Sequence, residues 1–177
     1  SRVTDITMIQ DAFHMLPTTM SDVIVVHKSS LLQANNYLTH IESAMLGCSF
    51  SIGYSCVSNL ASVRPGDKVM VVGCNVAGLG ALATLNAYGI EDPFICDNSV
   101  NRLERADTYK CSIRLLSGKK VGIDRKVSDL TAGMDVVIVA NPNIVNIGNI
   151  CKCVVPFGKI IIIASNSHKN RYLPMGD

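Results

Sequence analysis

The sequence Arg64-Pro65-Gly66-Asp67 leads into Lys68 to Val72, then into Gly73-Cys74-Asn75-Val76-Ala77-Gly78, and later into Phe94-Ile95-Cys96-Asp97. Val69 to Val72 is a short, continuous apolar run, as expected of a central parallel strand covered on both faces. From Val76 apolar residues recur about every four positions, which predicts a helix that Gly89 ends. The strand, glycine-rich turn, helix and second strand together predict the first β-α-β unit of a dinucleotide-binding domain. The stripe of this helix that we expect to pack on the sheet contains Ala77, Ala81, Leu82, Leu85 and Tyr88.

The glycine-rich turn has residue types that suit a bound pyrophosphate. Gly73 allows a tight turn from strand to helix, and Gly78 lets the helix lie close to the strand. Unpaired N–H groups at the helix N-terminus would face the phosphates. The residues that we expect to bind this part of a dinucleotide are Gly73, Asn75, Val76, Ala77 and Gly78.

Asp97 lies 19 residues past Gly78, at the end of the predicted second strand. A carboxylate there can accept both ribose hydroxyls of the adenosine half and would repel a 2′-phosphate, so we expect NAD rather than NADP. Arg102 should lie at the outer edge of the bound adenosine. As a solvated charge, it should weaken the preference for NAD over NADP only slightly. Asn141 follows the predicted fourth strand, where it would also meet the cofactor.

Asn75 occupies the position that is the middle glycine of the dinucleotide fingerprint, so its side chain leaves two outcomes open. Asn tolerates a positive φ better than other non-glycine residues, so the turn can survive and NAD can still bind. In that case Asn75→Gly would change affinity little. If the Cβ and amide block the cleft instead, the same substitution would restore binding.

Further motifs surround this unit in a fixed order. In chain order they are Thr18 to His27, Gly47-Cys48-Ser49-Phe50-Ser51-Ile52-Gly53-Tyr54, Asn59 to Val63, Pro65-Gly66-Asp67, and Val154 to Lys159 followed by Ile160 to Ala164. In this joint order the chain resembles the medium-chain, zinc-type alcohol dehydrogenase family over roughly Ala12 to Pro174. The resemblance implies a Rossmann-type fold, NAD as cofactor, and hydride transfer between an alcohol or carbonyl substrate and nicotinamide.

The same resemblance implies a zinc ligand at Cys48, which matches the last catalytic zinc ligand of the family. The other two ligands belong to family segments that have no counterpart here, because none of the four histidines stands in a Gly-His-Glu motif. Ile52 replaces a residue that is often threonine near the nicotinamide. We therefore expect this chain by itself to be inactive, and zinc to bind only with the missing ligands. The alternatives are a non-catalytic scaffold subunit of a larger assembly and, less favoured, an NAD-sensing module.

Composition narrows the class of protein. The 177 residues suit one domain of ordinary size, with 48% hydrophobic and only 17% charged residues. The net charge of +2 comes from scattered residues, which predicts no nucleic-acid partner. No apolar stretch approaches the length of a membrane span. Seven cysteines without a Cys-x-x-Cys spacing indicate reduced thiols, so we expect a cytoplasmic or other reducing intracellular compartment.

The remaining pattern predicts an α/β, doubly wound parallel sheet of order 3-2-1-4-5. We expect residues 1–46 to be a strand and helix remnant of a catalytic domain, and 47–177 to be the NAD-binding domain. The fifth strand would be an edge, so we expect a homo-oligomer or a subunit of a larger complex. The other expected elements are a strand at Asp22 to Val26, two helical pieces in Ile41 to Val63 broken near Cys48 and Gly53, a helix at Val100 to Lys110, a third strand in Ser112 to Leu116 or Val121 to Ile123, strand Asp135 to Val139, helix Ile144 to Val154 and strand Lys159 to Ala164.

Overall fold

The computed structural model describes residues 22–111, 113–116 and 123–163, which fall into two compact units, 1–39 and 40–177. In the described part of the first unit, the only regular element is the short 3-10 helix η1 (Lys28–Ser30). The strand predicted at Asp22 to Val26 is wrong. Val23 and Val25 are 81% and 63% exposed, so no partner surface buries the apolar side of that stretch.

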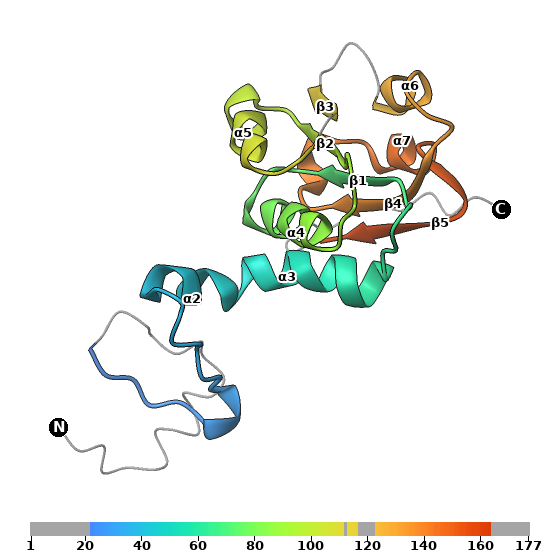
Figure 1. Ribbon diagram of the computed structural model, residues 1–177. Coiled ribbons are helices and arrows are strands. Elements are labelled where there is room, and N and C mark those ends of the chain that lie inside the picture. Colours follow the sequence, from blue (N-terminus) through green and yellow to red (C-terminus); the bar gives the residue numbers. More distant parts are fainter. Residues whose placement is uncertain (1–21, 112, 117–122, 164–177) are drawn as a thin grey trace. The chain divides into compact units, whose positions relative to one another are not determined.

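The second unit is built on a five-stranded parallel sheet of order β3-β2-β1-β4-β5, which confirms the predicted order and the α/β class (Figure 1). Val72, the last residue of the central strand, pairs with Cys96 on one side and with Val139 on the other. All four residues of that strand are buried, as its unbroken apolar sequence predicts. The strands are β1 (Val69–Val72), β2 (Phe94–Asp97), β3 (Ile113–Leu116), β4 (Met134–Val139) and β5 (Val154–Ile162).

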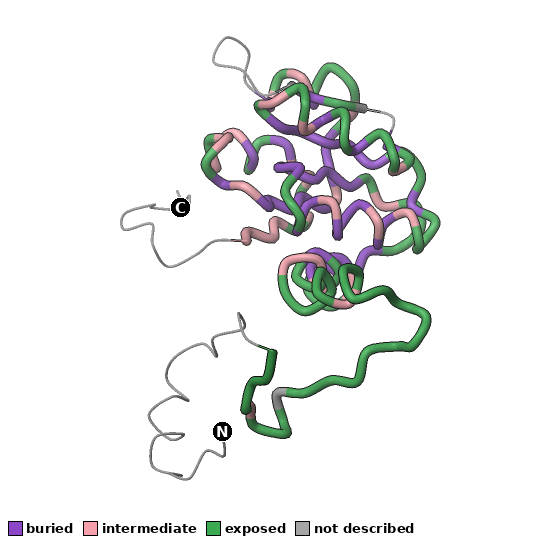
Figure 2. The backbone as a smooth tube through the Cα atoms, turned by 90° about the vertical axis from the view of Figure 1, so that its left-hand side faces the viewer, coloured by how far each residue is buried: buried purple, intermediate pink, exposed green. Residues whose placement is uncertain are grey.

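Helices cover both faces of this sheet (Figure 1), and the buried residues gather in this second unit (Figure 2), where they form two apolar layers. One layer joins alternate sheet residues such as Val71 to Leu82 and Val57; the other joins Val72 to Val127 and Ile150. The helices of the first layer are α3 (Ser49–Ser55), its π-helical continuation η2 (Cys56–Ala61), α4 (Val76–Ala87) and α5 (Val100–Arg105) with the 3-10 turn η3 (Ala106–Thr108). The helices on the other face are α6 (Ile123–Ser128) and α7 (Ile147–Cys151), which follows the 3-10 turn η4 (Pro142–Ile144).

Helix α4 lies between the sheet and α3, so it is buried on more than one side. Ala81, Leu82 and Leu85 are buried as predicted, but Gly80 and Thr84 are buried too. Tyr88 does not belong to the core stripe, because it is 42% exposed and its hydroxyl lies 2.8 Å from the Ser58 hydroxyl of η2. The apolar surface of α4 is therefore wider than a single stripe.

Several predicted boundaries need correction. The helical break near Cys48 is confirmed between α2 (His40–Leu46) and α3, but the break near Gly53 is wrong because α3 runs through it. Of the two alternatives for the third strand, the structure contains the first, and Ile123 begins α6 instead. The helix predicted from Ile144 forms only over α7, since the Asn146 side chain caps it by accepting the N–H of Gly148. The fifth strand begins earlier than predicted, and Ala164 lies outside the described residues.

Within the described residues, no helix has the length and hydropathy needed to cross a bilayer.

Gly53 provides a test of the contact between α3 and α4. A Cβ at this position would lie 2.1 Å from the Ala77 carbonyl oxygen and 2.5 Å from the Ala81 nitrogen. Gly53→Ala should therefore lower the free energy of unfolding by about 1–3 kcal/mol, although alanine favours helix more than glycine. Gly47→Ala is the control, because its Cβ would meet only the Ala44 carbonyl oxygen at 3.6 Å. Equal urea midpoints for the two variants would show that α3 does not depend on this close approach.

Candidate functional site

The candidate site lies where the carboxyl ends of β1 and β4 meet, since the connections after these two strands run to opposite sides of the sheet. This is the position at which open parallel sheets bind ligands. After β1 the chain turns at Gly73, with a φ of +106° that favours glycine. A Cβ there would also lie 2.7 Å from the Cβ of Asn141, which follows β4. Gly73 thus lets the two loops approach closely.

Gly78 places the first turn of α4 against the same loop. A Cβ on Gly78 would lie 1.8 Å from the Gly73 carbonyl oxygen, so only glycine fits. Val76 and Ala77 precede it in the first helical turn, at the positive end of the helix dipole. Residues 73–78 therefore make a close-packed turn at the N-terminus of α4, called the cradle below, and we expect its backbone N–H groups to suit a phosphate.

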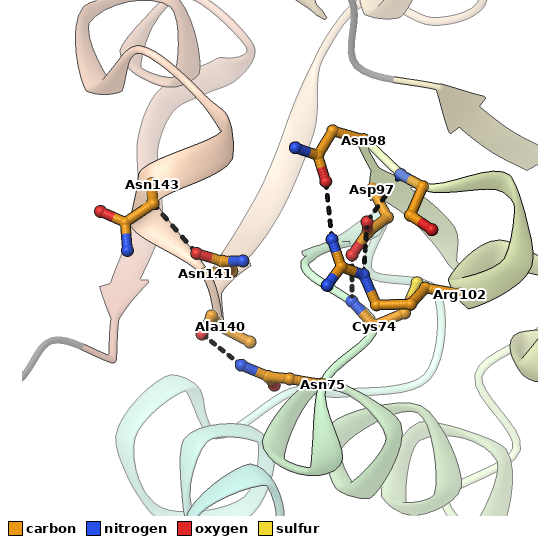
Figure 3. A network of polar contacts seen from close by, with 9 residues as sticks. Cys74, Asn75, Asp97, Asn98, Arg102, Ala140, Asn141 and Asn143 are labelled. Atoms are coloured by element: carbon orange, nitrogen blue, oxygen red, sulfur yellow. Dashed lines mark hydrogen bonds and ion pairs between the residues drawn. The ribbon is translucent and has the colours of Figure 1, made fainter.

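The Asn75 side chain reaches from the turn after β1 to Ala140 after β4 (Figure 3). Its oxygen accepts the Gly78 N–H at 3.0 Å, which caps α4, and its nitrogen donates to the Ala140 carbonyl oxygen at 2.8 Å. Asn75 has a φ of −81°, so the positive φ considered from sequence is not needed and the residue is unstrained. The asparagine amide therefore accepts one of the N–H groups at the N-terminus of α4, and it links the loop after β1 to the loop after β4.

Asp97 is the last residue of β2 and is only 1% exposed. Its Oδ2 accepts the Cys74 N–H from the glycine-rich turn at 2.9 Å. Its Oδ1 accepts the Ser99 N–H and the Arg102 Nε–H, both at 2.9 Å. This carboxylate therefore holds together the β1 loop, the end of β2 and the start of α5.

Arg102 is not the solvated charge expected from sequence. Its guanidinium pairs with Asp97, and its terminal nitrogen donates to the Asn98 side-chain oxygen at 2.7 Å (Figure 3). The side chain remains 41% exposed, so it forms the outer surface over the buried carboxylate.

Two buried thiols border Asp97. Burial, and secondarily the negative charge of Asp97, raises the pKa of Cys74 to about 12, and the same two causes raise the pKa of Cys96 to about 12. Neither thiol therefore forms an appreciable thiolate near neutral pH, and both act as small apolar side chains.

Cys48 lies apart from this network, at the exposed junction between α2 and α3. Its sulfur accepts a long contact of 4.0 Å from the Ser49 hydroxyl. Across residues 22–111, 113–116 and 123–163, no three His, Cys, Asp or Glu side chains are grouped to hold a metal ion. These residues therefore do not by themselves make a zinc site at Cys48.

The described residues also line an open pocket of about 430 Å³ at the opposite end of the sheet. It is lined by residues that precede β1, β2 and β4, such as Lys68, Glu91 and Thr131. The Lys68 amine already donates to the Thr131 hydroxyl at 2.8 Å. Because parallel sheets bind ligands at their carboxyl ends, we place the candidate site at the Asp97 end.

The residues predicted as cofactor ligands are thus brought to one end of the sheet, and their binding roles stay predictions. Sequence reasoning missed the two side-chain contacts that fill this end, from Asn75 and from Arg102. An asparagine just before a helix is an N-cap signal, and Arg102 in the first turn of α5 lies four residues after Asn98, which precedes that helix, so both signals were readable. The Ala140 carbonyl could not be identified, because only the fold brings it beside Asn75.

Segments of this chain are similar in sequence to known dehydrogenases. No family model matches the chain. A 64-residue segment is 36% identical to alcohol dehydrogenase B of Mycobacterium tuberculosis, covering 36% of this chain and 17% of that protein. A 74-residue segment is 35% identical to S-(hydroxymethyl)glutathione dehydrogenase of Escherichia coli, covering 41% of this chain and 20% of that protein. Both matched segments come from dehydrogenases, in line with the resemblance of this part of the chain to the medium-chain, zinc-type alcohol dehydrogenases.

Solved structures share the fold of this alcohol dehydrogenase-like chain. An alcohol dehydrogenase from Escherichia coli in complex with NADH superposes with a TM-score of 0.71 at 15% identity, over 84% of this chain and 43% of the other. The zinc-dependent alcohol dehydrogenase 2 of Streptococcus pneumonia, in its apo form, gives 0.67 at 23% identity, over 81% and 41%. The chain therefore spans less than half the length of the proteins it matches.

Asp97 should be essential to the fold of the alcohol dehydrogenase-like chain. Asp97→Ala leaves the Cys74 and Ser99 N–H groups and the Arg102 guanidinium without their acceptor, so the free energy of unfolding should fall by about 3 kcal/mol. Asp107→Ala is the matched control, because its ion pair with Arg114 is about half exposed on both sides and should contribute about 0–1 kcal/mol. Urea unfolding of both variants measures the difference. Similar losses would show that the carboxylate of Asp97 has no special structural role.

Proposed function

We propose that this chain is the NAD-binding portion of an alcohol dehydrogenase-like oxidoreductase, which passes hydride between an alcohol or carbonyl substrate and nicotinamide. The observation that carries the proposal is the cradle between β1 and α4, where a Cβ at Gly73 or Gly78 would collide with neighbouring backbone. The relatives support the reaction class, since the matched segments come from alcohol and S-(hydroxymethyl)glutathione dehydrogenases. We propose residues 1–46 as the remnant of a catalytic domain and 47–177 as the nucleotide-binding domain.

Each predicted residue has a role in this proposal. The first turn of α4 binds the pyrophosphate through N–H groups, and Asp97 and Arg102 border the adenosine ribose. Asn141 borders the cofactor from the β4 side, because it directly faces Gly73. Bound NAD would supply the hydride acceptor, while these residues bind and orient it.

The Asn75 amide competes with a dinucleotide for the cradle. The pyrophosphate must displace a side chain that already satisfies the Gly78 N–H and the Ala140 carbonyl. Wild-type affinity for NADH is therefore reduced by the free energy of these two hydrogen bonds, each about 1 kcal/mol.

Asn75→Gly should consequently bind NADH about three- to thirtyfold more tightly than the wild type, because glycine leaves the Gly78 N–H free to donate to the pyrophosphate, no side chain has to be displaced, and glycine costs little as a cap. Asn75→Ala should give most of the gain if the amide, rather than the Cβ, is the obstacle. Asn86→Ala is the control, since Asn86 makes two comparable hydrogen bonds to the Lys110 backbone at the other end of α4. Calorimetric titration gives the affinities. Unchanged affinity in both Asn75 variants would place the amide outside the path of the cofactor.

A second candidate function is a non-catalytic scaffold, and the filled cradle favours it. Asn75 joins the two loops and Asp97 is satisfied by donors of its own chain, so the site end of the sheet is stable without a ligand. Failure of wild-type and both Asn75 variants to bind any adenine dinucleotide would contradict the NAD-binding proposal and favour the scaffold.

The 177-residue chain should show no alcohol dehydrogenase activity by itself. A catalytic zinc needs three protein ligands, and the sequence has only Cys48 at a position that matches the family. Purified protein of verified mass should contain far less than one zinc per chain by elemental analysis. Zinc-dependent reduction of NAD by a panel of alcohols, well above background, would refute this prediction.

A further inference from the structure

The first part of β5 contains a bulge that presents an aromatic side chain to solvent. Met134 and Val136 of β4 pair with Val154 and Lys159 of β5, so between these pairs β5 advances five positions and β4 only two. Extra residues of this kind leave the ladder and bend the strand. Phe157 lies in this bulge and is 104% exposed, so no described part of the chain covers its ring.

Phenylalanine is a residue type that the backbone at this position does not favour. Phe157 has a φ of +67°, in the left-handed region that bulky side chains rarely adopt. Pro156 precedes it, and proline followed by a residue with positive φ is typical of a type II turn, in which glycine or asparagine is usual at the second of these positions. Backbone strain of this kind persists mainly at functional sites. Because the ring gains no packing in its own chain, we looked for a surface that could bury it in another.

The open pocket of about 430 Å³ lies beside the bulge. A Cβ on Gly133 would lie 2.8 Å from the Val155 side chain of the bulge, and Gly133 is three residues after Leu130, which lines the pocket. Leu130 is 53% exposed, and Phe94 contributes a second apolar side chain to the lining. An apolar cavity of about 150 Å³ holds a benzene molecule. The pocket therefore has room for the ring of a phenylalanine.

The pocket and the bulge also differ in charge. Three carboxylates and one amine line the pocket, from Asp67, Glu91, Asp92 and Lys68. On the other side, the exposed Lys152 precedes Cys153, whose carbonyl oxygen would lie 3.3 Å from a Cβ on Gly133. Glu91 and Lys152 are both exposed, and neither is in an ion pair within the described residues. The bulge and the pocket are therefore complementary in shape and in charge.

We propose that this end of the sheet is a self-association surface, on which Phe157 of each copy enters the pocket of a second copy and Lys152 faces Glu91 of that copy. Because the bulge and the pocket lie side by side, a two-fold axis between the copies allows both insertions at once. Aromatic side chains are enriched at the centre of such contacts. The surface is at the amino ends of the strands, opposite the cradle, and it does not depend on the proposed function.

The expected contact is small. A phenylalanine buries about 150–250 Å², whereas a standard interface buries about 800 Å² per partner. We therefore expect a reversible dimer with a dissociation constant of about 1 µM to 1 mM.

Sedimentation equilibrium of the 177-residue chain over a range of concentrations tests the proposal. Phe157→Gly should weaken dimerisation at least about tenfold, because it removes the side chain that fills the pocket. The urea midpoint of this variant should be unchanged or higher, since glycine adopts a positive φ without strain. Val100→Ala is the control, because Val100 is a 53% exposed apolar residue at the other end of the sheet, just after β2. It should change the dissociation constant by less than about twofold.

Two further experiments test the contacts of the dimer directly. The sequence contains no tryptophan, so Phe157→Trp introduces a single fluorescent reporter. Its emission maximum should move to shorter wavelength as the concentration rises, because the ring leaves water when the dimer forms. Lys152→Glu should weaken dimerisation, and the double variant Lys152→Glu with Glu91→Lys should restore it, because the two facing charges are exchanged.

The opposite outcomes are distinct from these. A wild-type chain that stays monomeric up to about 1 mM would overturn the proposal. So would a dimer that Phe157→Gly leaves intact, because the contact would then lie elsewhere, for example along β5. An emission maximum of Phe157→Trp that does not change between monomer and dimer would exclude insertion of the ring, and a double charge variant as weak as Lys152→Glu alone would exclude the pairing of Lys152 with Glu91.

Discussion

The buried carboxylate of Asp97 is the interaction on which the candidate site depends. It accepts backbone N–H groups from the turn after β1 and from the start of α5, and it pairs with Arg102. Without it, the N–H groups of Cys74 and Ser99, in the loops after β1 and β2, would lose their hydrogen-bond acceptor. The same carboxylate is also the group expected to meet a ribose. One side chain is therefore needed for the fold and is also expected to bind a ligand. In this structure its carboxylate accepts hydrogen bonds from its own chain.

Small residues decide how closely the layers around this site can approach. Gly78 lets α4 begin against Gly73, and Gly53 lets α3 lie on α4. As a result α4 is buried by the sheet on one side and by α3 on the other, and its N-terminus is fixed at the carboxyl end of β1. The cradle is thus a consequence of backbone packing. Asn75 then uses the space that this packing creates, by capping α4 and reaching Ala140.

Much of the fold could be predicted because the signals are local. A continuous apolar run gave β1, Gly89 marked the end of α4, and the spacing to Asp97 located β2. Predictions failed where packing overrides local pattern. Gly53 does not break its helix, because it serves a close contact, and the stretch from Asp22 forms no strand, because nothing buries its apolar residues.

The sequence by itself determined the order of strands, the glycine-rich turn and the presence of a carboxylate at the end of β2. Hydrophobic periodicity and glycine positions are properties of short segments, so they can be read without the fold. Only the tertiary structure decided what the polar side chains do. Arg102 is five residues from Asp97 and Ala140 is 65 residues from Asn75, yet each pair is in contact. Such contacts depend on side-chain direction and on the meeting of β1, β2 and β4 at one edge, which no single segment of the chain specifies.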